Sequence, residues 1–163
     1  MANAKVCLSV LIEDTKSFLE AADIIYEKMQ VDKEGFFQDD LLAYPYTVLS
    51  CYAIESGIKN LLIKNNISFG KKHDLLTLFD LLPKPLKNKI YYLKNVFWNQ
   101  GIYQETPEEI FRDLLDKNKM NFINARYFFE QKKDDVYICL PFLKATSHAI
   151  FDLIVEETKK TTV

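Results

Sequence analysis

Apolar residues recur along this chain at the three- and four-residue spacing of α-helices, with polar residues between them. The first such stretch predicts a helix over residues 3–29. The next, YTVLSCYAIESGIKNLLI, is apolar almost all round and predicts a buried central helix that begins at residue 39 or 44 and ends at 64. Gly57 lies inside it and costs about 1 kcal/mol relative to alanine. We therefore expect another helix to pass close to Gly57.

The stretch KKHDLLTLFDLLP predicts a third helix within residues 71–83, after the turn-forming NNISFG. Its apolar face comprises Leu75, Leu78, Phe79 and Leu82. Pro83 and Pro85 are expected to stop this helix, because proline lacks the N–H that a helix interior needs. A further helical segment is predicted over residues 86–98.

The segment TPEE carries the clearest helix start in the chain. Thr106 is the expected N-cap, Pro107 the first helical residue and Glu109 the return partner of a capping box. The helix is predicted to continue over residues 106–131. Its apolar stripe comprises Ile110, Phe111, Leu114, Leu115, Phe122 and Phe129. A last helix is predicted over residues 141–159.

No alternating strand pattern, internal repeat or linker interrupts this series, except that DVYICL alternates over a few residues. The scarcity of glycine and proline, with 4 and 5 residues in 163, also favours long helices. The sequence therefore predicts an all-α fold. We expect a single domain over residues 1–163, arranged as an antiparallel helical bundle of five or six helices.

The net charge of −2 is unusual for a general nucleic-acid binder, although local lysine groups would permit a phosphate-contacting patch. Cys7, Cys51 and Cys139 are widely spaced and odd in number, so we expect free thiols rather than disulfides or zinc. No metal or cofactor is expected. No secretory leader or membrane span is expected either, which favours a cytoplasmic protein.

Phosphate-binding glycine loops, zinc-protease motifs and nucleophile elbows are absent from the sequence. The unusual polar pair is Glu55 and Lys59, which interrupts the apolar central helix at the i, i+4 spacing of an ion pair. A buried charge is costly unless it is paired. The two residues therefore pair with each other, or they meet partners from another helix.

Two further positions carry candidate chemistry. Arg126, Tyr127 and Glu130 lie together in NARYFFEQ, where Arg126 would either pair with Glu55 or hold a phosphate. His73 stands at the expected start of the third helix, where it or Asp74 would be the N-cap. We favour His73 as a joint that hydrogen-bonds Glu55 or Glu130, over a catalytic role.

The other histidine, His148, belongs to a polar stripe with a spacing of four residues. The stripe comprises Lys144, His148, Asp152 and Glu156. A solvent-facing histidine is expected there.

Several of these segments together resemble the HEPN family of all-helical domains. The shared features are the acid-then-lysine helix YAIESGIKNLLIKNN, the helix start KHDLLTLFDLLP and the late element Arg126-Tyr127-Phe128-Phe129-Glu130. FLEAADIIYEKM also looks like the small-residue first helix of such domains. The resemblance covers residues 17–155 and implies an antiparallel helical bundle that often forms homodimers. It also implies a toxin–antitoxin, phage-defence or RNA-processing setting, in some cases with a nucleotidyltransferase-type partner.

Active HEPN proteins are metal-independent ribonucleases with an arginine followed by a histidine four to six residues later. Here Arg126 is followed by YFFEQKKDD, and Arg112 also lacks such a histidine. General acid–base catalysis of RNA cleavage needs a group that titrates near neutrality at the scissile phosphate. Ribonuclease activity of the usual kind is therefore not expected.

Three hypotheses follow. The first is a non-catalytic or divergent HEPN-like protein that binds RNA, a nucleotide or a partner protein near Glu55, Lys59, His73, Arg126 and Tyr127, as a homodimer. The second is a ribonuclease toxin in which His73 acts with Arg126. The third is a structural or regulatory helical module in which these residues are internal joints.

Overall fold

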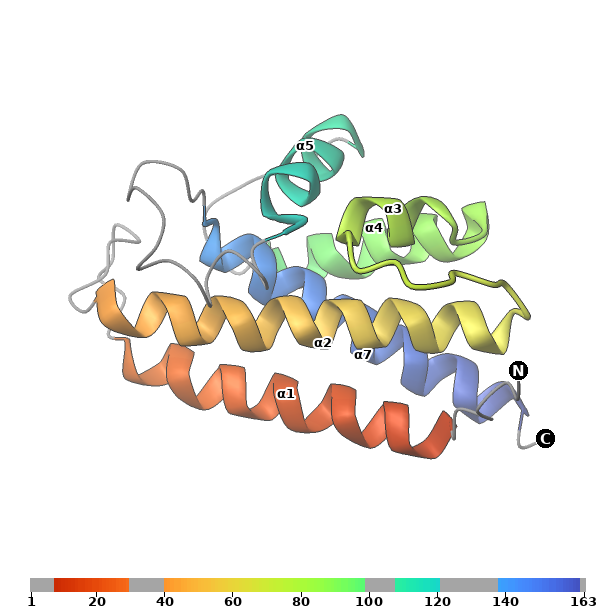
Figure 1. Ribbon diagram of the computed structural model, residues 1–163, viewed down its shortest axis with the longest axis horizontal. Helices are drawn as coiled ribbons and strands as arrows, with labels where there is room; N and C mark the ends of the chain where they lie inside the picture. The colour runs from red at the N-terminus through yellow and green to blue at the C-terminus, as the bar shows by residue number, and fades with distance from the viewer. Residues whose placement is uncertain (1–7, 30–39, 99–107, 121–137, 162–163) are drawn as a thin grey trace.

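The computed structural model describes residues 8–29, 40–98, 108–120 and 138–161, and every regular element in these ranges is helical (Figure 1). In chain order the elements are α1 (Leu8–Lys28), the 3-10 helix η1 (Asp40–Leu42), α2 (Ala43–Lys64), α3 (Leu75–Asp80), α4 (Lys84–Trp98), α5 (Glu108–Asn118) and α7 (Leu140–Thr161). The predicted all-α class is therefore confirmed for the described residues.

Helix α2 lies in the middle of the molecule. In Figure 1, α1 runs beside it in the opposite direction, α7 passes behind it, and α3, α4 and α5 lie on the side away from α1. The fully buried apolar side chains of α2 are Tyr46, Cys51, Ala53, Ile54, Ile58, Leu61 and Leu62. Neighbours on several sides explain why its sequence shows no polar face.

Two helices pass close to α2 at Gly57. A Cβ atom at this position would lie 2.5 Å from Cγ2 of Ile150 on α7 and 3.5 Å from Cγ2 of Thr15 on α1. One residue earlier, the hydroxyl groups of Ser56 and Thr15 are hydrogen-bonded at 2.9 Å. The prediction that another helix passes close to Gly57 is therefore confirmed, and the crossing brings three helices together.

Most of the predicted helix positions agree with the structure. Helix α1 ends one residue before the predicted end, and the predicted start at residue 3 lies outside the described residues. Helix α2 ends at Lys64 as predicted, and Pro45 occupies its first turn. Helix α7 exceeds the predicted range of 141–159 by one residue at its start and two at its end.

The predicted role of Pro85 in stopping the third helix is wrong. Helix α3 is short and ends at Asp80, whereas Pro85 is the second residue of α4, which begins at Lys84 instead of residue 86. Proline is tolerated in the first helical turn, because the N–H groups of that turn have no intrahelical acceptor. The two prolines thus belong to the junction of α3 and α4.

The predicted continuation of one helix to residue 131 is also wrong. Helix α5 ends at Asn118, whose side-chain amide donates to the carbonyl of Leu114 at 2.8 Å. The carbonyl of the next residue, Lys119, accepts the N–H of Leu75 at 3.3 Å, which directs the chain toward the start of α3. Phe111 and Leu115 are buried as predicted, but Ile110 is 48% exposed.

The expectation of free thiols is confirmed for the cysteines that the structure describes. Cys51 and Cys139 are free cysteines, whereas Cys7 lies outside the described residues, as do Thr106 and Pro107. Within the described ranges, no helix combines the length and apolar character needed to cross a membrane.

We predict that Gly57→Ala lowers the free energy of unfolding by about 1–3 kcal/mol, because the added methyl group collides with Ile150. Urea unfolding monitored by circular dichroism measures the change. The double variant Gly57→Ala/Ile150→Ala is expected to lose less stability than the sum of the single variants. A stabilised Gly57→Ala protein, as expected for an uncrowded helix glycine, would contradict this packing.

Candidate functional site

The connection between α2 and α3 brings His73 back to the part of α2 that carries Glu55. After Lys64 the chain reverses through two residues with positive φ, Asn66 at 56° and Gly70 at 60°. The N–H of Ile67 donates to the carbonyl of Leu62 at 2.9 Å, which closes the end of α2. The left-handed conformation suits asparagine and glycine, so this sequence forms the reversal with little strain.

Asp74 fixes the start of α3. Its Oδ1 atom accepts the N–H of Thr77 at 2.6 Å, and its backbone is extended, as expected for an N-cap. The sequence left the cap open between His73 and Asp74, and the structure assigns it to Asp74. The side chain of His73 is therefore available for another contact.

That contact is a hydrogen bond to Glu55. His73 Nδ1 lies 2.8 Å from Glu55 Oε1, and Lys59 Nζ lies 2.6 Å from the same oxygen. The Glu55 side chain is 6% exposed, that of Lys59 16% and that of His73 53%. The predicted pair of Glu55 with Lys59 and the predicted joint between His73 and Glu55 are therefore both present. A nearly buried carboxylate holds two cationic or donor groups at the protein surface.

This arrangement fixes the position of one imidazole proton. A carboxylate oxygen only accepts hydrogen bonds, so His73 Nδ1 is the nitrogen that carries hydrogen in this contact. The other ring nitrogen, Nε2, is not used by Glu55, and about half of the side chain is in contact with solvent. Glu55 Oε2 is buried and has no hydrogen-bond partner among the described residues.

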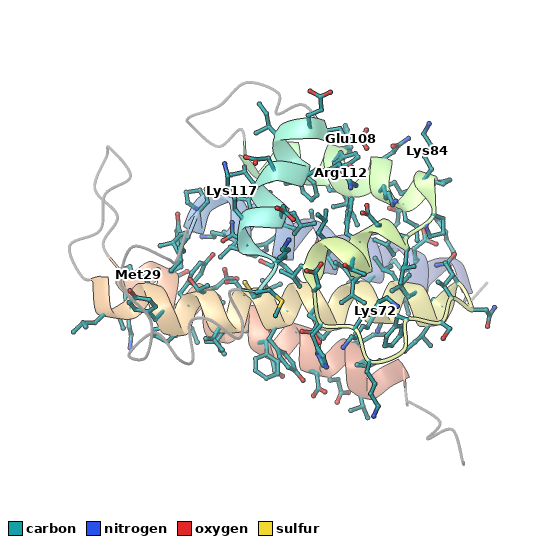
Figure 2. All side chains as sticks on the ribbon, turned by 45° about the horizontal axis from the view of Figure 1, so that its top comes forward. Met29, Lys72, Lys84, Glu108, Arg112 and Lys117 are labelled. Atoms are coloured by element: carbon teal, nitrogen blue, oxygen red, sulfur yellow. The ribbon has the colours of Figure 1, made fainter. Side chains whose placement is uncertain are left out.

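Two exposed lysines precede His73. Lys71 and Lys72 form no ion pair with any residue that the structure describes, and Figure 2 shows Lys72 on the connection between α2 and α3. Lys119, at the end of α5, lies near the same helix start. Its pKa is raised by a hydrogen bond to Asp116 and, to a smaller extent, by the charge of Asp74. We call the group Lys59, Lys71, Lys72, His73 and Lys119 the basic edge.

Two lysines of the basic edge are paired with acids, which limits its net positive charge. Glu55 neutralises Lys59, and Asp116 pairs with Lys119 at 2.7 Å. The two lysines of this group without an ion pair to a described residue are therefore Lys71 and Lys72, which directly precede His73 in the sequence. Phe69 adds an aromatic ring, with Lys59 Nζ 5.5 Å from its centroid.

Three predicted site residues, Arg126, Tyr127 and Glu130, lie outside the described residues. Whether Arg126 pairs with Glu55 or approaches His73 stays a prediction. Among the two acids proposed as partners of His73, Glu55 is the one the structure assigns.

The expectation of a solvent-facing His148 is wrong. Its Nε2 atom lies 2.9 Å from Oδ1 of Asp23 on α1, and the side chain is 27% exposed. In the same predicted stripe, Lys144 Nζ lies 4.0 Å from the centroid of the Tyr26 ring on α1. The polar stripe of α7 is therefore partly covered by α1, which a sequence with no information on helix neighbours does not reveal.

A second polar cluster, which the sequence did not single out, joins α3, α4 and α5. Arg112 binds both carboxylate oxygens of Asp80, and this hydrogen bonding is the main reason that the pKa of Asp80 is lowered. Tyr91 donates to Glu108 at 3.0 Å (Figure 2 labels Arg112 and Glu108). No local spacing signals these contacts, because each joins residues 17 or 32 positions apart. They attach α5 to the rest of the fold.

One lysine is buried in the core. Lys94 on α4 is 1% exposed, and its Nζ atom lies 5.5 Å from the centroid of the Phe111 ring. Burial lowers its pKa to about 8, because the charged form is poorly solvated there. The sequence gave no reason to select this lysine from the other lysines of α4.

The part of the chain that the structure describes contains no group of three or more histidine, cysteine, aspartate or glutamate side chains placed to hold a metal ion. Comparisons with protein-family models, curated proteins and solved structures found no match to this chain.

We predict that His73 and Glu55 are energetically coupled. His73→Ala is expected to lower the free energy of unfolding by about 1 kcal/mol. Glu55→Ala is expected to cost about 3 kcal/mol, because it leaves the mostly buried Lys59 ammonium without its carboxylate. Urea unfolding of both single variants and the double variant measures the coupling. If the two losses add within about 0.3 kcal/mol, the joint contributes nothing to stability.

A second prediction concerns Lys94. Between about pH 8 and its unfolded value of 10.5, Lys94 is deprotonated in the folded protein and protonated in the unfolded chain. The unfolded state then binds more protons, so raising the pH favours folding. We expect the stability of the natural protein, relative to Lys94→Met, to increase across this window in thermal unfolding. A constant difference would show that Lys94 stays charged when folded.

Proposed function

We propose that this chain is a HEPN-like helical protein that binds RNA through the basic edge and does not cleave it. The observation that carries the proposal is the arrangement at its centre. Lys71 and Lys72 are exposed, form no ion pair with described residues, and directly precede in the sequence His73, whose imidazole is hydrogen-bonded to Glu55. Phosphate groups are bound by such positively charged and N–H donor groups.

Pre-organisation supports a binding role for His73. A side chain that is already fixed loses less conformational entropy when a ligand binds. The ring of His73 is hydrogen-bonded to Glu55, and the next residue, Asp74, is fixed as the N-cap of α3. Phe69, half-buried in the same connection, offers a ring on which an unpaired base would stack. These features favour single-stranded RNA over a partner protein as the ligand.

The HEPN resemblance supports the same class of function. The acid-then-lysine helix corresponds to α2 and the HDL helix start to α3, and the contact between Glu55 and His73 joins these two motifs. A homodimer, a nucleotidyltransferase-type partner and a toxin–antitoxin, defence or regulatory setting in the cytoplasm are further proposals that follow from the resemblance alone.

A non-catalytic role fits the environment of His73. The Nδ1 atom of His73 is hydrogen-bonded to Glu55, and Lys59 binds the same carboxylate oxygen. Such contacts are expected of a structural joint. They leave Nε2 of His73 for a ligand. The alternative ribonuclease would need Arg126 beside His73, and position 126 lies outside the described residues.

We predict that the protein binds a fluorescent oligouridylate at low salt and that affinity decreases as salt is raised. Lys71→Ala/Lys72→Ala is expected to weaken binding about 10-fold at low salt and to reduce the salt dependence by about two phosphate contacts. Fluorescence anisotropy measures both effects, and the RNA recovered afterwards should be intact.

The matched control is Lys16→Ala/Lys84→Ala, which removes the same charge from exposed positions of α1 and α4. Figure 2 shows Lys84 well apart from Lys72. Equal losses in the two double variants would mean that only net charge matters, and no saturable binding at low salt would overturn the proposed function. Competition by uridine monophosphate would indicate that a mononucleotide is sufficient.

A further inference from the structure

We propose that binding of a phosphate group at the basic edge is coupled to uptake of one proton by His73. This inference deepens the proposed function and depends on it. It adds that the ligand group in contact with His73 is a phosphate oxygen, and that the complex forms best when both ring nitrogens carry hydrogen.

The first step of the argument is the fixed role of Nδ1. Its contact with Glu55 Oε1 at 2.8 Å requires hydrogen on Nδ1, since the carboxylate only accepts. A neutral imidazole has a single N–H. When His73 is neutral and joined to Glu55, its Nε2 atom therefore carries a lone pair and no hydrogen.

The second step concerns the ligand. Phosphate oxygens are acceptors and are negatively charged, so they are repelled by the lone pair of a neutral Nε2 atom. They are attracted by the N–H of an imidazolium, which forms a charge-assisted hydrogen bond. A phosphate contact at Nε2 with the Glu55 contact intact thus requires the doubly protonated ring. The proton comes from solvent and no covalent bond other than this N–H is formed.

Charged groups of both signs surround His73. On α2 these are Glu55, which accepts a hydrogen bond from the ring, and Lys59, which pairs with the same oxygen. In the connection and at the cap they are Lys71, Lys72 and Asp74.

From α5, Lys119 adds positive charge near Asp74, although Asp116 partly offsets it. Added phosphate charge would compensate the lysines and favour protonation of His73. Because coupling between two binding events is reciprocal, lower pH must then favour the ligand.

His148 provides a matched control within the same chain. It is also bonded to a carboxylate of another helix, since its Nε2 atom lies 2.9 Å from Asp23 Oδ1. It differs in being 27% exposed and in lying on α7, with its carboxylate partner on α1. A general effect of pH on carboxylate-bound histidines would therefore appear in both variants, whereas the proposed coupling belongs to His73 alone.

The experiment is an anisotropy titration of an oligouridylate at about pH 6, 7 and 8 and constant low ionic strength, a range in which histidine changes its charge. The natural protein and His148→Gln are expected to lose about 10-fold in affinity from the lowest to the highest pH. His73→Gln, which keeps a hydrogen-bonding side chain at an exposed position, is expected to bind more weakly at about pH 6 and with little pH dependence.

Calorimetry gives a second measurement that does not depend on affinity. Titrations at about pH 7 in two buffers with different ionisation enthalpies report the number of protons taken up. The natural protein is expected to take up a fraction of one proton and His73→Gln close to none. Thermal unfolding of each variant verifies that it is folded.

The failures of the two proposals are distinguishable. Absence of saturable RNA binding at every pH would remove the proposed function and this inference with it. Saturable binding with the same pH dependence in the natural protein and in His73→Gln, or with no proton uptake, would overturn this inference alone. Equal effects of His73→Gln and His148→Gln would likewise overturn it.

Discussion

The burial of α2 on several sides is the constraint on which the rest of the structure depends. A helix in the middle of a bundle has few positions where a polar group reaches water, so its charged residues must be paired within the protein. Glu55 meets this requirement with Lys59 from its own helix and His73 from the connection that follows. At Gly57, two residues later, α7 crosses so closely that an added Cβ would collide with Ile150.

The pairing of buried Glu55 also determines the position of a group at the surface. Glu55 is almost inaccessible, yet it positions an imidazole of which about half is exposed. Two exposed lysines, Lys71 and Lys72, directly precede His73 in the sequence. The pairing of a buried carboxylate, which the core requires, thus fixes a donor group in the same exposed connection that carries these two lysines.

The remaining helices are attached through contacts between residues distant in the sequence. Asp80 and Arg112 join α3 to α5, Tyr91 and Glu108 join α4 to α5, and Lys89 joins α4 to Glu156 on α7 at 2.7 Å. These pairs are exposed and contribute little energy individually. The aromatic packing of Phe111 against Phe79, Tyr91 and Phe142, with ring centroids 5.0–5.3 Å apart, holds α5 more strongly.

Local patterns in the sequence were sufficient for the elements whose faces repeat regularly. The spacing of apolar residues located α1, α2 and α7 to within a few residues where they are described, because burial of one face imposes the 3.6-residue period directly. Local spacing also predicted the ion pair of Glu55 with Lys59, since residues four apart on a helix are always neighbours. The position of His73 at a helix start suggested a joint to Glu55 or Glu130, and the structure shows the contact with Glu55.

Only the tertiary structure decided the features that depend on which helices are neighbours. The end of α5 at Asn118 is set in part by the contact of Lys119 with the start of α3, and His148 is covered because α1 lies over that side of α7. The selection of Lys94 as a buried lysine likewise depends on helix packing. A periodic pattern states that a face is buried, whereas the identity of the residues opposite is a property of the folded chain.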